Sequence, residues 1–233
     1  MRIVILIITL GLLTSCATST TPTVQQGPGA EVTYDGLHRL NDTILDKVWL
    51  KPDIDLSQYD KLLVEGAGIQ YRPLKRYSRK SGDDGAFPLT EQQKETLRQA
   101  VGEVMLEEIS RTKNYAITDQ PGRGVLKITL GLIDVVSRIP PERVSARGGM
   151  YLSDLGSAVL VMELRDSRTN EALARVVDGT RVEPVVMQKS NPVTNIMEVK
   201  RSARRWGSRI RTSLDELHEL GCFVCSVPGS IEN

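Results

Sequence analysis

The sequence predicts an α+β fold: a two-layer sandwich with a mostly antiparallel sheet of about five strands and two amphipathic helices on one face. Three observations indicate this fold. Segments that alternate apolar and polar residues are separated by short turns, which is typical of antiparallel strands. Two longer segments repeat apolar residues every three or four positions, as helices with one buried face do. Two such helices need one sheet face to cover.

The strands are expected between residues 61 and 182. The first covers residues 61–71, and its Gly66 and Gly68 indicate a bulge or a close approach of another backbone. The segment 125–136 alternates well in its first half, as a half-buried strand does. The remaining strands are expected at 115–118 and in a hairpin of 157–164 and 172–182, turning at 166–170.

The first helix is expected to begin at Thr90, because Gln93 three residues later completes a capping box. We expect it to end near Thr112, with Asn114 as a left-handed stop. Its buried face would carry Leu97, Val101, Val104, Met105 and Ile109.

The second helix is expected to begin at Thr194, after a chain break at Asn191 and Pro192, and to stop at Gly221. Every step along its apolar stripe is three or four residues, so one face is expected to be buried. The stripe consists of Ile196, Val199, Ala203, Trp206, Ile210, Leu214 and Leu217.

The N-terminus has the pattern of an export signal. Arg2 is followed by the apolar residues 3–13, which are too few for a bilayer span of about 20 residues. The next residues are Thr14, Ser15 and Cys16, and this order resembles the lipobox of bacterial lipoproteins. Residues 1–15 are therefore predicted to be a signal peptide, and Cys16 the lipidation site. In lipoproteins an Asp after the lipidated Cys favours retention in the inner membrane, so Ala17 favours sorting to the periplasmic face of the outer membrane. The alternative is that Cys16 occurs by chance and the chain is an ordinary secreted protein.

Composition divides the mature chain into three parts. Residues 16–45 are predicted to be a flexible tether, because 17–33 are rich in Thr, Ser, Pro, Gln and Gly. A coil of that length typically reaches roughly 20–25 Å. A single α+β domain is expected over 46–221, followed by a C-terminal tail, 222–233, that carries a cysteine pair.

Charge and motifs exclude several classes of function. Lys plus Arg number 30 and Asp plus Glu 29, so the chain has no basic footprint for nucleic acid. Aromatic residues make up 4%, too few for stacking platforms. The sequence contains no His-Glu-x-x-His, P-loop or Gly-x-Ser-x-Gly motif. We expect no enzyme, catalytic residue, cofactor or metal.

Cys222 and Cys225 are the sharpest chemical feature of the sequence. A disulfide is expected, because export brings both thiols into an oxidising compartment. A redox pair is the first alternative, although the pair follows a helix C-terminus, which disfavours a thiolate. A metal site is the second, and it would need further ligands such as His218.

Arg201, Arg205 and Arg209 are four residues apart on the second helix and share a face. This face is a candidate site for anionic lipid headgroups or an acidic partner. The alternative is a solvated face, compensated by Glu198, Asp215 and Glu219 nearby.

Four stretches, taken with Cys16, have the pattern of one family. They are Tyr59-Asp60-Lys61 with the strand after it, residues 121–126, residues 156–167 and residues 171–174. They resemble a family of bacterial lipoproteins known only as a domain of unknown function, numbered three-three-one-three. The resemblance covers about 36–221 and implies a fold, but no active site. The family usually has Gly where this chain has Asn170, which tolerates the same left-handed conformation.

These observations favour a non-enzymatic lipoprotein, anchored to the membrane through Cys16, that contacts a protein partner in the cell envelope. The alternative is a lipid- or glycan-binding module. That module would show an enclosed apolar pocket of a few hundred Å³ between sheet and helices. A protein-binding surface would show an exposed patch instead.

Overall fold

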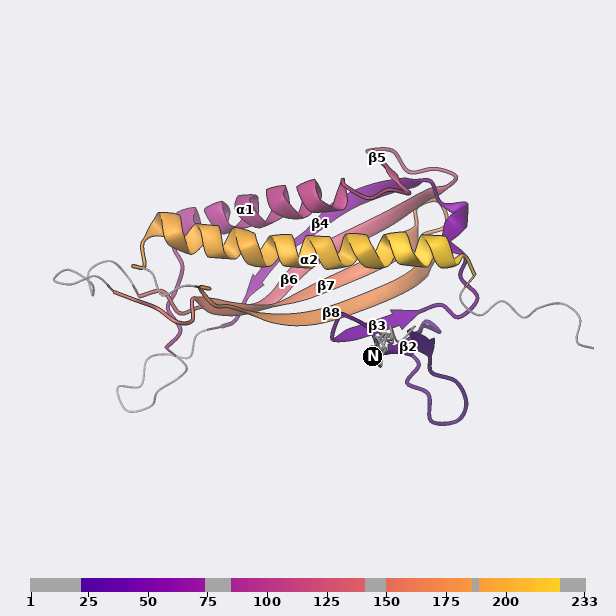
Figure 1. Ribbon diagram of the computed structural model, residues 1–233, viewed down its shortest axis with the longest axis horizontal. Helices are drawn as coiled ribbons and strands as arrows, with labels where there is room; N and C mark the ends of the chain where they lie inside the picture. The colour runs from indigo at the N-terminus through magenta and orange to yellow at the C-terminus, as the bar shows by residue number, and fades with distance from the viewer. Residues whose placement is uncertain (1–21, 74–84, 141–149, 186–188, 223–233) are drawn as a thin grey trace, which may run out of the picture.

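The computed structural model describes residues 22–73, 85–140, 150–185 and 189–222, and in these the chain forms one open sheet of eight strands and two long helices. Both helices lie on the same face of the sheet (Figure 1). The strands are β1 (Thr23–Val24), β2 (His38–Asn41), β3 (Lys47–Leu50), β4 (Lys61–Tyr71), β5 (Ala116–Thr118), β6 (Val125–Ser137), β7 (Gly156–Asp166) and β8 (Ala172–Val182), and the helices are α1 (Glu91–Ile109) and α2 (Pro192–Leu220), with a 3-10 turn at Leu56–Gln58.

The sheet has the order β1-β2-β3-β8-β7-β6-β4-β5. Five of its seven strand pairs are antiparallel, as expected, while β4 pairs in parallel with both β5 and β6. The crossover through α1 makes this parallel pairing possible, because parallel neighbours need a long connection. The expected count of about five strands is wrong, since β1, β2 and β3 add to the sheet beyond β8.

Two of the three additional strands correct the predicted tether at 16–45. β1 and β2 lie within that segment, so the ordered part of the chain begins at least as early as Thr23. Their two to four residues are too few to show alternation, and they depend on pairing for stability. β3 pairs with β8 from Lys47 opposite Val177 to Leu50 opposite Ala174. We call residues 22–50 the N-terminal arm.

Ion pairs also hold the N-terminal arm against the open face of the sheet. Arg175 on β8 donates to Asp35 at 2.9 Å and to Glu163 on β7 at 2.7 Å. Burial raises the pKa of Asp35, but hydrogen bonds from Thr33 and Arg175 outweigh it and hold this pKa below its ordinary value. Burial also raises the pKa of Glu163. Its hydrogen bonds to Arg165 and Arg175 outweigh this effect, so the pKa of Glu163 lies below its ordinary value.

α1 begins as the sequence predicts. The Thr90 hydroxyl accepts from the Gln93 amide at 3.2 Å, and the Gln93 side chain accepts from the Thr90 amide at 2.8 Å, which confirms the capping box. The helix ends at Ile109 with Ser110 as its C-cap. A left-handed Asn114 is wrong, because Asn114 is not among the residues with positive φ.

α2 begins three residues earlier than expected. Asn191, not Thr194, is the N-cap: its side chain accepts from the amides of Val193 and Thr194. Pro192 stands at the first helical position, where its missing N–H costs nothing, so Asn191 and Pro192 start the helix instead of only breaking the chain. Gly221 ends the helix with φ of 66°, which confirms the predicted stop.

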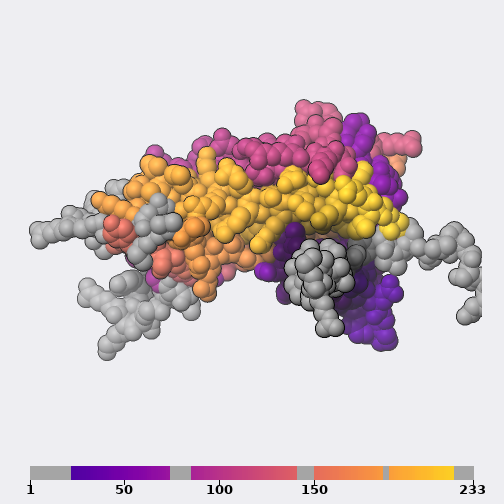
Figure 2. Space-filling view, in the orientation of Figure 1, coloured from indigo at the N-terminus to yellow at the C-terminus, as the bar shows by residue number. Residues whose placement is uncertain are grey.

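The core lies between the helices and one face of β4, β6, β7 and β8. Large apolar side chains fill it, among them Leu62, Ile109, Leu126, Ile128, Leu160, Leu164, Trp206 and Ile210. α2 forms a long ridge over this layer with α1 beside it (Figure 2). The two helices approach closely at Gly207, where an added Cβ would lie 2.6 Å from the Cβ of Glu108.

Candidate functional site

The predicted cysteine sites fall mostly beyond the described residues. Cys16 and Cys225 lie outside them, so lipidation and the disulfide stay predictions. Cys222 is described: it is half-buried and forms an antiparallel β-bridge with Asp55. The end of α2 is thereby held beside the segment that leads into β4.

The three arginines predicted to share a face do so, but each has a partner inside the domain. Arg201 lies 2.7 Å from Glu198, and Arg205 donates to the Ser202 hydroxyl at 3.1 Å. Arg209 lies 3.7 Å from Asp178 on β8. Because Glu198 and Asp178 are almost fully buried, two of the arginines compensate carboxylates that water cannot reach. Binding of an anionic surface by this face remains a prediction.

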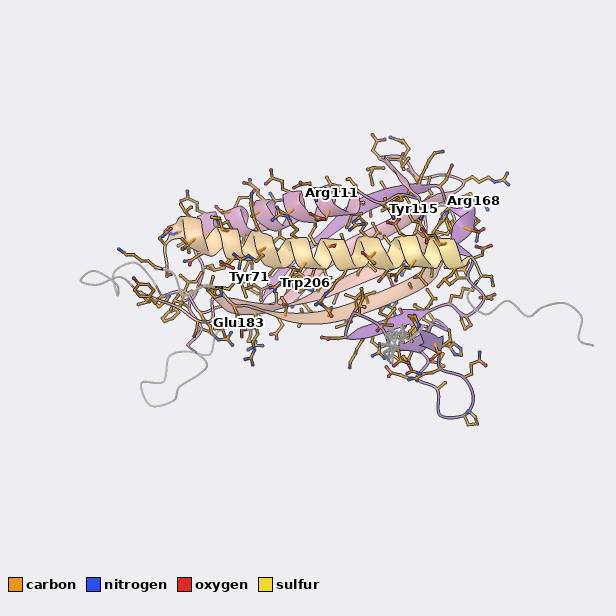
Figure 3. The ribbon with its side chains drawn as sticks, viewed as in Figure 1. Tyr71, Arg111, Tyr115, Arg168, Glu183 and Trp206 are labelled. Carbon is orange, nitrogen blue, oxygen red and sulfur yellow. The ribbon has the colours of Figure 1, made fainter. Side chains whose placement is uncertain are left out.

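Asp178 is a key polar residue that the sequence does not single out. It is 1% exposed, and its carboxylate accepts from the indole of Trp206 at 2.7 Å and from the Asp46 amide at 2.8 Å. The side chain of Asp46 in turn accepts from the Gly179 amide at 2.8 Å. Trp206 lies between α2 and the sheet (Figure 3). A signal was present: Asp178 follows the apolar Ala174 and Val176 at alternate positions of β8, and it is the only acidic residue of that strand.

A second polar cluster lies at the C-terminal end of α2. The Tyr115 and His218 rings meet edge to face with centroids 5.2 Å apart, and Asp215 accepts from the Thr112 hydroxyl. Burial, helped by the Asp215 charge, raises the pKa of Tyr115. No group of three or more metal-binding side chains occurs in the described part of the chain, so nothing there recruits His218 as a ligand.

The most distinctive concave feature is a groove between α1 and the sheet, of about 220 Å³. α1 passes over β4 with its N-terminal end near the C-terminal end of the strand, where the Lys94 ammonium lies 5.2 Å from the Tyr71 ring centroid. Leu106 lines the groove and is 45% exposed, so the groove reaches solvent at this residue. The lining is mainly apolar and comes from α1 (Arg98, Val101, Gly102, Met105, Leu106), β4 (Val64, Glu65, Gly66, Gly68, Ile69), β6 (Leu130, Gly131, Leu132) and β7 (Leu160).

Glycine residues on both walls leave room for this groove. A Cβ added to Gly66 on β4 or to Gly102 on α1 would meet no atom within 4 Å. The register of β4 against β6 also shifts between Gly66 and Gly68, which confirms the predicted bulge, and Gly68 has φ of 91°. Glycine removes the side chains that would otherwise fill the space between helix and strand.

The groove runs beside a sheet edge. β5 pairs with β4 only at Lys61, Leu62 and Leu63. From Val64 to Tyr71, β4 pairs with β6 on one side, and the described residues place no strand on its other side. The apolar groove and the unpaired edge of β4 therefore lie next to each other. Neither feature can be predicted from the sequence of β4 or α1 alone, because both depend on how the elements pack.

A second hollow, of about 370 Å³, is a broader and more open depression. Its charged pair is Arg72 with Asp134, which are hydrogen-bonded to each other. That hydrogen bond holds the pKa of Asp134 below its ordinary value. An internally satisfied pair in an open depression is less suited to holding a ligand than the groove.

Neither described helix has an 18-residue stretch apolar enough to cross a bilayer. Among curated proteins no match was found. Several solved structures are similar at low identity, with TM-scores below 0.5. A Xanthomonas campestris protein of family DUF330 is 8% identical, with TM-score 0.43, over 72% of this chain and 89% of its own. A candidate neuraminyllactose-binding hemagglutinin homolog from Helicobacter pylori is 11% identical, with TM-score 0.38, over 70% and 87%. A candidate lipoprotein from Caulobacter crescentus is 15% identical, with TM-score 0.28, over 71% and 90%.

The family comparison is decisive. The family described as "Protein of unknown function (DUF3313)" matches residues 28–210, which is most of the chain. This match confirms the resemblance drawn from the turns and strands of the sequence. The chain belongs to the DUF3313 family.

Proposed function

We propose that this chain is a non-enzymatic lipoprotein of the outer membrane, anchored at its periplasmic face, that binds a protein partner through the groove between α1 and β4. The groove carries the proposal, because it combines mainly apolar lining with an exposed strand edge. The buried carboxylates, by contrast, are each engaged by arginines, amides or hydroxyls of the domain itself.

The size of the groove favours a protein partner over the alternative, a lipid or a glycan. About 220 Å³ is less than the roughly 300–1,000 Å³ of typical small-molecule sites. The groove is also open along β4, whereas a lipid-binding module would enclose its ligand. Its mainly apolar lining does suit an acyl chain, which keeps the lipid-binding module as the second candidate.

The anchor is tested at Cys16. Replacing it with serine is expected to release the protein from membranes into the soluble periplasm, because serine accepts no thioether-linked lipid. Membrane sedimentation followed by immunoblotting measures this. Full retention of the Cys16→Ser protein in the membrane fraction would refute the lipid anchor.

Partner binding is tested by placing a photo-crosslinking amino acid at Leu106 in intact envelopes. The matched control carries it at Val193, which is 66% exposed on α2 but outside the groove. We expect a discrete protein adduct at Leu106 and none at Val193, identified by mass spectrometry. A lipid or glycan adduct at Leu106 would favour the second candidate, and no adduct there would contradict both.

A further inference from the structure

The edge of β4 offers backbone hydrogen bonds to a partner. In a strand, every second residue directs its N–H and C=O to the same side. From Val64 onward one set pairs with β6, and the other points to the side on which the described residues place no strand. Exposed edges of this kind template pairing with another chain, and proteins normally cover or charge them. Here Glu65, Gly66, Ala67 and Gly68 are all exposed.

We infer that the groove binds by strand addition: a short extended peptide pairs with the edge of β4 and inserts one large apolar side chain beneath α1. This inference rests on the proposed function and names the chemistry of the partner. Strand addition supplies affinity through main-chain hydrogen bonds and specificity through pockets for alternate side chains. The groove supplies one such pocket beside the edge.

The volume of the groove fixes how much of the peptide enters it. An apolar cavity of about 150 Å³ holds a molecule of the size of benzene. The groove, at about 220 Å³, therefore accommodates one leucine, methionine or phenylalanine side chain. Since Met105 and Leu160 close its inner end, the inserted side chain would contact the core directly.

The shape of the edge favours a short peptide over a second copy of this chain. The register of β4 shifts twice, between Gly66 and Gly68 and between Ile69 and Tyr71. Irregularities of this kind twist an edge and oppose pairing with another rigid sheet. A flexible segment can follow the bend. Val64 to Ile69 offers room for about six residues at roughly 3.3 Å each.

Charge adds a further requirement on the peptide. Arg98 at the groove is already paired with Glu95. Glu65 forms no ion pair within the described residues. Because neighbouring side chains of a strand alternate between faces, the residue next to the inserted one would lie on the side of Glu65. Lysine or arginine at that position would complement it, as opposite charges do across paired strands.

Two glycine variants test the pocket. Gly102→Leu extends a side chain into the groove from α1, and Gly102→Ala is its matched control, since both raise helix propensity but alanine leaves most of the space. The probe is a phage-displayed library of random heptapeptides, selected on the purified domain. We expect enrichment of peptides with a large apolar residue flanked by a basic one. Their affinity should fall at least tenfold for Gly102→Leu and less than threefold for Gly102→Ala.

Backbone methylation separates strand addition from simple pocket filling. N-methylation of alternate amides in a selected peptide should weaken binding at least fivefold, because each removes one main-chain hydrogen bond. Methylation of the intervening amides should have little effect. No enriched peptide, equal binding by Gly102→Leu, or no alternation would overturn strand addition. A protein adduct at Leu106 without alternation would leave the proposed function standing and remove only the strand-addition mode.

Discussion

Replacing Asp178 with alanine is expected to destabilise the domain by roughly 2–3 kcal/mol. The carboxylate is 1% exposed and accepts from the Trp206 indole at 2.7 Å and the Asp46 amide at 2.8 Å. Alanine would leave the buried indole N–H of Trp206 without an acceptor, which costs roughly 1–3 kcal/mol. The amide of Asp46 would lose the same acceptor at a smaller cost, because Asp46 is exposed and its amide can regain water. Arg209 adds little to the loss, because its side chain is 48% exposed and regains water.

A double-mutant cycle with Trp206→Phe isolates the largest part of this loss. Phenylalanine keeps most of the ring and removes the N–H. We expect a coupling energy of about 1.5–3 kcal/mol, the range for a hydrogen bond to a charged group. The assay is urea unfolding followed by far-ultraviolet circular dichroism for the wild type, both single variants and the double variant. The exposed Glu219→Ala serves as the control, with an effect within about 0.5 kcal/mol.

The same substitution should loosen the N-terminal arm, because Asp178 holds the Asp46 amide. Amide hydrogen exchange in β2 and β3 is expected to rise in Asp178→Ala before the rest of the sheet opens. Additive effects of Asp178→Ala and Trp206→Phe would refute the hydrogen-bond argument. Unchanged exchange in β2 and β3 would show that strand pairing alone holds the arm.

Three further predictions concern other parts of the domain. Gly207→Leu should lower the free energy of unfolding by at least roughly 1–3 kcal/mol through overpacking of the helices, whereas Gly102→Leu at an open site should not. Arg175→Gln should cost most stability above pH about 4.5, because its carboxylate partners have lowered pKa values. Their stabilisation is lost as the pH falls through the folded-state pKa values, so the difference in urea midpoint should shrink as the pH is lowered below 3.8, the ordinary pKa of Asp35. Thiol labelling of the purified mature protein should find Cys222 and Cys225 protected until reductant is added, and two labels before reduction would exclude the disulfide.

Local signals determined the elements that could be predicted. The capping box at Thr90, the stop at Gly221 and the left-handed Asn170 each depend on a few neighbouring residues, and the structure has all three. The arm was missed for the opposite reason. β1, β2 and β3 have two to four residues each, and they become strands only by pairing with one another and with β8.

The candidate site depended still more on contacts between distant segments. The bulge at Gly66 was visible in the sequence, but Gly102 looks like an ordinary weak position in a helix. Only the fold brings the two glycines to one hollow. The arginines of α2 are the converse case. Their spacing predicts the shared face, whereas the helix sequence alone does not reveal the buried carboxylate on β8 that engages Arg209.

If Cys16 carries the proposed lipid, the early start of β1 would limit where the protein can act. With an anchor at Cys16, only about seven residues separate the lipid from Thr23, so a coil typically spans roughly 15 Å and at most about 25 Å. The domain would therefore stay close to the leaflet that holds its lipid and could not extend deep into the periplasm. Its encounters would then become a search in two dimensions, in which even a weak contact is made often. A partner would have to be embedded in that leaflet or delivered to it.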